Sequence, residues 1–241
     1  MHGDHFFGLV GLISTFRLLT RETDLHIYGP KGLKEVITLQ MKLAKSWTNF
    51  NLIFHELSSN QSELIFEDDR VEVYTIPLKH RVYTNGFLFK EKENERKLDI
   101  NKAIDLNIDK AYFRKLKQGF DVINENGEII KNEVVTFNGP MPKSYAFCSD
   151  TVYNEAIIPI IKDVDVLYHE STFLESHKHL TEQTKHSTAK EAATIAKKSN
   201  VNTLILGHYS TRYDDYELFR NEAKEVFENV ELAKDGKVFE F

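Results

Sequence analysis

The sequence predicts an α/β fold, because hairpin patterns occur early in the chain and strands alternate with helices later. Apolar segments before residue 90 are separated by turn residues, whereas those after residue 145 are followed by helical patterns. No repeat or low-complexity linker interrupts the chain. We therefore predict a single domain over 1–241, with the charged stretch 90–118 as an insert.

The early elements are two helices and several strands. Helices are predicted over 8–21 and over 33–47, where apolar residues have helical spacing. Strands are predicted over 24–28, where Gly29-Pro30 should end the strand, over 51–57 and over 86–89. A hairpin over 62–66 and 70–76 should turn at Asp68-Asp69. The insert 90–118 shows short helical stretches and no strong strand.

The later elements begin with a hairpin over 121–137 that turns at Asn126-Gly127. Strands are then predicted over 145–149, 164–168 and 202–206, and helices over 155–162, 189–198 and 215–227. This alternation favours a sheet with helices packed on it.

Composition limits the function classes. Hydrophobic residues make up 41% and charged residues 28% of the chain, as in soluble globular proteins. Cys148 is the single cysteine, which excludes an internal disulfide and fits a reducing compartment. The apolar run 6–19 is too short for a membrane span and lacks the features of a signal peptide. We expect a cytoplasmic protein without a membrane partner, and the net charge of −6 gives no support for nucleic-acid binding.

The chain opens with Met1-His2-Gly3-Asp4-His5, which carries two imidazoles and a carboxylate within four residues. These are the ligands that zinc takes when one position stays open for water. The spacing predicts that these side chains can face two adjacent cations. One more ligand is expected just before Met1.

Other candidate ligands come directly after predicted strands: His80, Asp150, His169, Glu170 and His208. Strand ends converge on one rim of a sheet, so these side chains could meet. Each has an alternative interpretation, since a single histidine after a strand is commonly structural and Asp150 could be a helix N-cap. The repeated placement favours a shared site.

His186 stands just before the predicted helix 189–198, whose start carries a capping box from Thr188 to Glu191. The capping box is structural, but it does not account for His186. A glutamate hydrogen-bonded to a histidine can hold the ring in one tautomer and tune it as a proton donor.

Together these residues resemble the motifs of the ribonuclease Z family, tRNA 3′-processing endonucleases of the metallo-β-lactamase superfamily. The matching segments are His2 to His5, His80, Cys148-Ser149-Asp150-Thr151, His169-Glu170-Ser171-Thr172-Phe173, His186-Ser187-Thr188-Ala189 and 206–213. The resemblance implies a metallo-β-lactamase αβ/βα four-layer sandwich.

The sequence departs from the family pattern in three places. The first histidine of the opening motif is absent, and so are the strands that precede it in the family, as in an N-terminally truncated chain. We therefore expect Met1 to be an internal residue of a longer protein. Residues 108–117 stand where the family has a Gly-Pro segment, which leaves the mode of tRNA binding open.

The resemblance implies two zinc ions. One would take His2, His80 and the histidine that this sequence lacks, the other Asp4, His5 and His208, and Asp150 would bridge both. Asp4 would orient the attacking water and accept its proton. The Glu170–His186 pair would protonate the leaving ribose oxygen.

The implied substrate is precursor tRNA. Arg212 would contact phosphate, although a structural salt bridge is an equal alternative. A tRNA-binding arm would lie in 90–118, where basic residues surround Tyr112 and Phe113; these are Lys110, Arg114, Lys115 and Lys117. The resemblance also implies a homodimer.

Two alternatives remain open at this point. The chain could be another metallo-β-lactamase hydrolase, such as a small phosphodiesterase or a thioesterase. It could also be a non-catalytic remnant that binds tRNA or a partner subunit, because one ligand and the first strands are missing.

Overall fold

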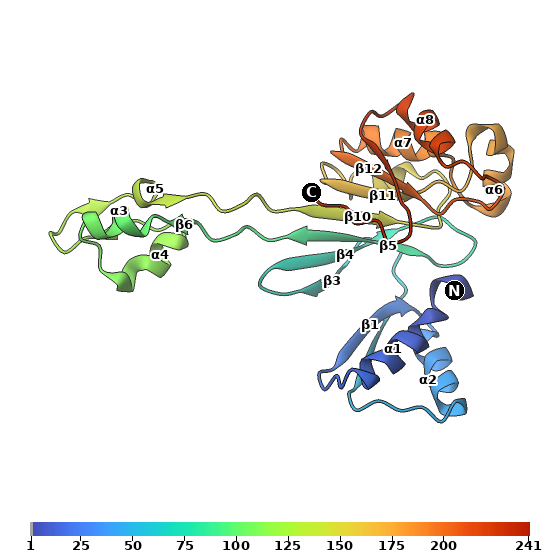
Figure 1. The fold of residues 1–241 in the computed structure, drawn as a ribbon, viewed down its shortest axis with the longest axis horizontal. Helices are drawn as coiled ribbons and strands as arrows, with labels where there is room; N and C mark the ends of the chain where they lie inside the picture. Colours follow the sequence, from blue (N-terminus) through green and yellow to red (C-terminus); the bar gives the residue numbers. More distant parts are fainter. Residues whose placement is uncertain (1) are drawn as a thin grey trace. The chain divides into compact units, whose positions relative to one another are not determined.

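A computed structural model describes residues 2–241 and shows the mixed α/β architecture that the sequence predicts (Figure 1). The chain divides into two compact units. The first comprises residues up to Leu64, Tyr74–Leu88 and Tyr145–Phe241, and the second comprises Ile65–Val73 and Phe89–Ser144. The predicted insert 90–118 lies within the second unit.

The largest sheet has seven strands in the order β13-β12-β11-β10-β5-β4-β3. Strands β10 to β13 pair in parallel, which requires a crossover connection between consecutive strands. The strand bounds are Leu64–Glu67 (β3), Val71–Pro77 (β4), Asn85–Glu91 (β5), Ser144–Cys148 (β10), Val166–Glu170 (β11), Thr203–Gly207 (β12) and Val230–Leu232 (β13). Our sequence analysis did not predict β13.

Helices α7 (Ala189–Lys198) and α8 (Glu217–Lys224) lie on one face of the parallel strands (Figure 1). The alanines of α7 are fully buried, and their small side chains let the helix approach the sheet closely. Thr188 and Glu191 form the predicted capping box at the start of α7. Cys148 is buried in the same core, where burial raises the pKa of its thiol to about 12.

The N-terminal part contains a short turn (η1, Gly3–His5), then α1 (Gly8–Leu18), β1 (Leu25–Pro30), α2 (Leu33–Leu43) and β2 (Leu52–Leu57). Strands β1 and β2 form a parallel two-stranded sheet, and the two helices bury Ile13, Ile37 and Met41 beside it. The first strand does end at Gly29-Pro30, but two residues later than the predicted end at Tyr28. Gly29 and Pro30 themselves still pair with β2, because proline is tolerated in an edge strand.

Two later predictions also need correction. Residues 155–162 form only a 3-10 turn (η3, Glu155–Ile157), because Pro159 lacks the N–H that a continuing helix requires. The hairpin at Asn126-Gly127 is confirmed but short, with β7 (Val122–Ile123) and β8 (Ile129–Ile130). The chain then forms α5 (Asn132–Val135) and β9 (Thr136–Phe137), which pairs with β6 (Lys97–Leu98).

The second unit has a small core of its own. Its helical pieces are α3 (Ile100–Asp105), η2 (Lys110–Tyr112) and α4 (Phe113–Lys117). They bury Ala103, Ile108 and Leu116 against Val122 and Val135. This agrees with the expected short helical stretches over 90–118. Within residues 2–241, no helix is long and apolar enough to cross a membrane.

The core beneath α8 gives a stability prediction. Phe219 is fully buried in the main core, whereas its neighbour Leu218 is 46% exposed. We expect Phe219→Ala to lower the free energy of unfolding by about 3–5 kcal/mol, because it removes buried surface and leaves a cavity. Leu218→Ala, the matched control on the same helix, should cost less than about 1 kcal/mol. Urea denaturation of both variants measures the difference, and equal costs would contradict the assigned packing of α8.

Candidate metal centre

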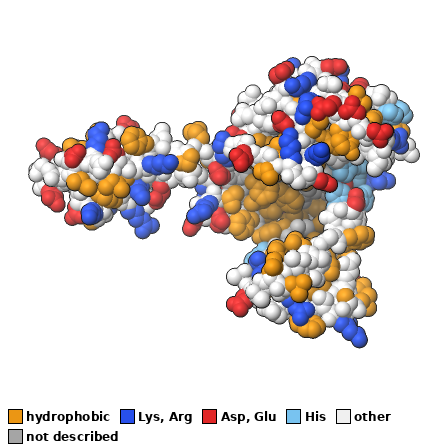
Figure 2. All heavy atoms as spheres, in the orientation of Figure 1, with side chains coloured by type: hydrophobic (Ala, Val, Ile, Leu, Met, Phe, Trp, Pro, Cys, Tyr) orange, Lys and Arg blue, Asp and Glu red, His pale blue; other side chains and the backbone are white. Residues whose placement is uncertain are grey.

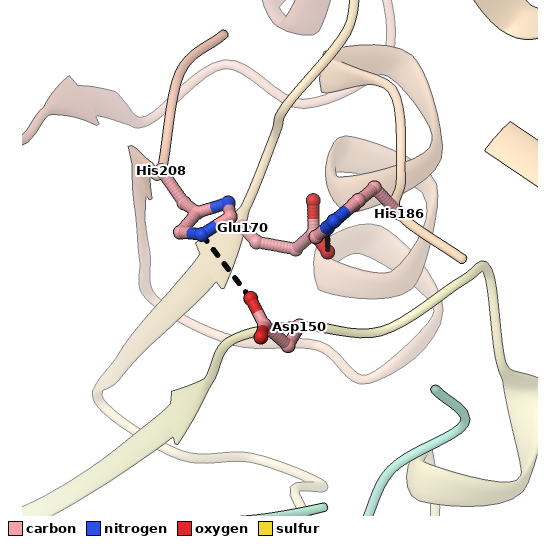
Figure 3. Close-up of side chains that lie close together, drawn as sticks. All are labelled: Asp150, Glu170, His186 and His208. Atoms are coloured by element: carbon pink, nitrogen blue, oxygen red, sulfur yellow. Dashed lines mark hydrogen bonds and ion pairs between the residues drawn. The ribbon is translucent and has the colours of Figure 1, made fainter. Parts of the chain in front are cut away.

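Three of the predicted ligands follow strands of the seven-stranded sheet. His80 follows β4, Asp150 follows β10, and His208 follows β12. Asp150 and His208 have left-handed backbones, with φ of 57° and 60°. Such conformations are costly for residues other than glycine and cluster at functional sites. Both side chains point toward a common space (Figure 3).

The Asp150 carboxylate lies at the centre of this space and is almost fully buried. Its Oδ2 lies 2.9 Å from His5 Nε2, and its Oδ1 lies 3.1 Å from His208 Nε2. His2 Nδ1 and His80 Nε2 each lie 3.9 Å from Oδ2. Four imidazoles from three separate segments thus surround one carboxylate, since His2 and His5 share the opening turn.

Two of these histidines have a tautomer that suits metal binding. His80 Nδ1 lies 2.9 Å from the Lys185 carbonyl oxygen, so this nitrogen carries the proton. The buried Nε2 of His80 then holds a lone pair and has no hydrogen-bond partner. Burial lowers the pKa of His80 and outweighs the Lys185 carbonyl and the Asp150 charge, which act to raise it. The lowered pKa favours the neutral ring. A neutral imidazole with its other nitrogen bonded to a carbonyl is a typical metal ligand.

The tautomer of His208 follows from a relay through Thr172. The Thr172 hydroxyl donates to Glu170 Oε2 at 2.7 Å and therefore accepts from His208 Nδ1 at 2.9 Å. His208 Nε2 is left as an acceptor that faces Asp150 Oδ1. Two acceptors 3.1 Å apart need a cation or a proton between them.

The donor set fits divalent metal ions. His2, His80 and Asp150 offer ligand atoms within 4.8 Å of one another, and so do Asp4, His5 and His208. Imidazole and carboxylate together suit zinc and similar transition metals. Asp4 is the most exposed of these side chains, and its Oδ2 lies 3.5 Å from His5 Nε2. These two groups contain the residues that the resemblance assigns to the two ions, and a third group joins Asp150 and His208 with Glu170 and His186.

Glu170 lies near the same atoms, but its carboxylate is hydrogen-bonded to protein donors rather than free to coordinate a metal. It is the last residue of β11 and is completely buried. Its carboxylate accepts hydrogen bonds from Thr151 N, Thr172 N, Thr172 Oγ1, Ser187 N and His186 Nδ1. These donors occupy the lone pairs that a cation would need. Burial would raise the pKa of Glu170, but the bonds from His186 and the other donors outweigh it and lower that pKa.

His186 lies 2.7 Å from Glu170 Oε1 through its Nδ1 (Figure 3). Its ring stands 5.2 Å from that of His208 and 5.1 Å from that of His80. Burial acts to lower the pKa of His186, but the Glu170 hydrogen bond and charge outweigh it and raise that pKa. The result is a partly buried imidazole that holds a proton beside the candidate metal ligands.

The structure also locates the remaining predicted residues. Arg212 lies over the Phe173 ring, with its guanidinium carbon 5.8 Å from the ring centre, and no salt bridge is found for it within residues 2–241. Arg114 and Lys117 line a hollow of the second unit together with Arg96 and Lys97. Lys115 lies 5.6 Å from the Tyr112 ring centre, and Lys110 is exposed in η2.

Sequence reasoning missed the residues that hold the carboxylate of Glu170. Thr172 and Ser187 belong to the recognised motifs, but their contacts could not be read from spacing. His169 was grouped with the candidate ligands after a strand, yet it is the penultimate residue of β11 and is fully buried. Because side chains alternate along a strand, His169 and Glu170 point to opposite faces.

A cavity of about 390 Å³ lies beside the ligands in the first unit. His2, His5 and Asp150 line one part of it, and apolar residues line the rest, among them Ile27, Tyr28, Leu57, Phe87 and Phe147. Figure 2 shows hydrophobic side chains gathered in a hollow near histidines on the face that it presents. The candidate centre therefore opens into a cavity whose wall is partly apolar.

No family model matches the chain, but curated relatives match it along nearly its whole length. The ribonuclease Z of Cytophaga hutchinsonii is 46% identical over 239 residues, which is 98% of this chain and 76% of that protein. The ribonuclease Z of Bacteroides fragilis is 41% identical over 237 residues, which is 98% of this chain and 78% of that protein.

Solved structures are similar in fold. The human tRNase Z, short form, has a TM-score of 0.65 at 24% identity and is covered to 76%, with 100% of this chain aligned. The metallo-β-lactamase fold protein YhfI of Bacillus subtilis has a TM-score of 0.62 at 17% identity, with 99% of this chain and 73% of that chain aligned.

The Glu170–His186 pair gives a pH prediction. Glu170 has a lowered pKa and His186 a raised one, relative to ordinary values of 4.5 and 6.5. The pair should therefore stabilise the fold fully between pH 4.5 and pH 6.5. This contribution is lost as the pH rises through the raised pKa of His186, or falls through the lowered pKa of Glu170. Glu170→Gln should lower the pKa of His186, which ring-proton NMR of the metal-free protein would follow. An unchanged His186 titration would contradict the assigned pairing.

Proposed function

The chain belongs to the ribonuclease Z family and is therefore a metal-dependent endoribonuclease of tRNA 3′ processing, and we propose that it removes 3′ trailers from precursor tRNA with two zinc ions. It has the metallo-β-lactamase fold of its structural neighbours, as the sequence predicted. The cleavage would leave a 3′-hydroxyl on the tRNA and a 5′-phosphate on the trailer.

The proposed ligands follow the two groups of donor atoms. His2 and His80 would hold one zinc ion, Asp4, His5 and His208 the other, and Asp150 would bridge them. When bound, a metal pair supplies a water of lowered pKa and neutralises charge on the phosphate. The lone pairs of His80 Nε2 and His208 Nε2, both aimed at Asp150, support this assignment.

The protein's own residues would move the protons. Asp4 would orient the attacking water and accept its proton. As the bond between phosphorus and the ribose O3′ breaks, His186 would give its proton to O3′. The carboxylate of Glu170 would stabilise the charged ring and keep its Nδ1 bonded at 2.7 Å. The observation that carries the proposal is this proton-holding pair beside a carboxylate surrounded by imidazoles.

Substrate binding would use basic residues of both units. We propose that Arg212, held near Phe173, contacts a phosphate close to the scissile bond. Residues 90–118 would act as the tRNA-binding arm through Lys110, Arg114, Lys115 and Lys117. Arg96 and Lys97 share a hollow with two of these side chains and would extend the same basic surface. The proposal further includes a homodimer and a cytoplasmic location, where precursor tRNA is processed.

Removing one metal ligand and the proton donor should have different effects. Asp150→Ala should lose both metal and cleavage, because its carboxylate would join the two sites. His186→Ala should keep its metal content but lower kcat for precursor tRNA by about 10²–10⁴-fold, the range typical of a lost general acid. Elemental analysis and single-turnover cleavage measure the two quantities. Loss of metal from His186→Ala would mean that His186 is a ligand instead.

Replacing the arm residues Lys110, Arg114, Lys115 and Lys117 by alanine should raise KM and leave kcat nearly unchanged. The slope of log affinity against log salt should become shallower by about 1 for each lost phosphate contact. Lys197→Ala, at an exposed lysine in the last turn of α7, is the matched control. Titrations of precursor tRNA at several salt concentrations measure the slope. An unchanged slope would remove the arm from the proposed tRNA contacts.

A further inference from the structure

His186 ends a loop that begins just after the strand carrying Glu170. The loop contains η4 (Glu175–Leu180) and α6 (Thr181–Thr184), and its ends are joined by a bridge between Phe173 and Thr188. Phe173 N donates to the Ser187 carbonyl at 3.1 Å, and Ala189 N donates to the Phe173 carbonyl at 2.9 Å. The position of His186 therefore depends on how the two ends of this loop are held.

Glu222 of α8 holds both ends from outside the loop. Its Oε2 accepts a hydrogen bond from Glu175 N at 2.7 Å, and its Oε1 accepts one from Lys190 N at 3.0 Å. Glu175 begins η4 and Lys190 lies in the first turn of α7. N–H groups at helix starts lack partners within the helix, and a carboxylate is the acceptor they bind best. One side chain thus connects the entrance and the exit of the His186 loop.

Burial and two neighbouring carboxylates disfavour the charged form of Glu222. Burial raises the pKa of Glu222, the backbone N–H groups of Glu175 and Lys190 lower it, and the carboxylates of Glu175 and Glu225 raise it again. Glu175 is itself fixed, because its Oε2 accepts from Thr188 Oγ1 at 3.2 Å. A carboxylate on the exposed face of α8 would be hydrated and would not bear these costs. In its actual position, Glu222 instead gains the two hydrogen bonds from the backbone N–H groups of Glu175 and Lys190.

The loop leaves His186 little freedom of its own. Lys185 has a left-handed backbone with φ of 61°. Ser187 is fixed by its N–H to Glu170 Oε2 at 3.1 Å and by its hydroxyl to the Thr151 carbonyl. A shift of the loop ends would therefore move the His186 ring between them. A displacement of about 1 Å can lower the rate about a hundredfold.

We infer that Glu222 is a positioning residue for His186, which clamps the two ends of its loop so that the imidazole is aligned with the leaving oxygen. The inference rests on the proposed function of His186 as the proton donor. Glu222 itself touches neither the candidate ligands nor His186 among the contacts of the described residues.

The test is the dependence of the rate on the leaving group. Glu222→Gln keeps the size of the side chain but turns an N–H donor toward one of the two backbone N–H groups, so one bond of the clamp is lost. We expect kcat for precursor tRNA to fall about 10–100-fold with KM nearly unchanged. The rate on bis(p-nitrophenyl) phosphate should stay within about twofold of the parent, because its phenolate leaving group needs no proton donor.

Two further variants make the outcome decisive. Glu225→Gln removes a carboxylate that is 62% exposed and, within residues 2–241, forms an ion pair with the Lys190 side chain alone, so both rates should stay at the parent level. His186→Ala should show the same selective loss on precursor tRNA. If Glu222→Gln slows both substrates equally, or slows neither, while His186→Ala is selective, the clamp inference is wrong and the proposed function stands. If His186→Ala is not selective, the proton-donor role itself fails.

Discussion

The structure around the candidate centre depends on a fully buried carboxylate. A charge removed from water is tolerated only when hydrogen bonds replace the water. Glu170 meets this condition with donors from three segments: Thr151 after β10, Thr172 after β11, and His186 and Ser187 before α7. Each segment also carries or adjoins a residue of the centre. The requirement to satisfy one carboxylate therefore fixes the positions of Asp150, His208 and His186 together.

The candidate metal ligands show the opposite situation, because their acceptors face one another. His208 Nε2 and Asp150 Oδ1 lie 3.1 Å apart, and His80 Nε2 is buried without a donor. Such an arrangement lowers stability without a cation and becomes favourable with one. The left-handed backbones of Asp150 and His208 add to this cost. The centre is thus organised by the surrounding fold, and the rigid Glu170 network supplies the support it needs.

The second unit follows a different principle. Its core consists of a few small and medium residues, such as Ala103, Leu116 and Val135, and the strands β6 to β9 have two residues each. Many of its apolar side chains stay exposed, including Phe120, Ile129 and Phe137. The basic and aromatic side chains on this small unit are the ones that the proposed contact with tRNA would use.

The sequence by itself determined the α/β class, most elements and nearly all residues of the candidate centre, because ligand types at strand ends and local motifs such as the Thr188–Glu191 capping box are written in short segments. It failed where distant partners decide the outcome. The first strand runs two residues further, to Pro30, because β2 pairs with it, and β13 forms because β12 offers a parallel edge. Only the tertiary structure decided the tautomers of His80 and His208, the role of Glu170 as an acceptor for three segments, and the clamp at Glu222. These depend on hydrogen bonds between residues far apart in the chain, and no local spacing encodes such bonds.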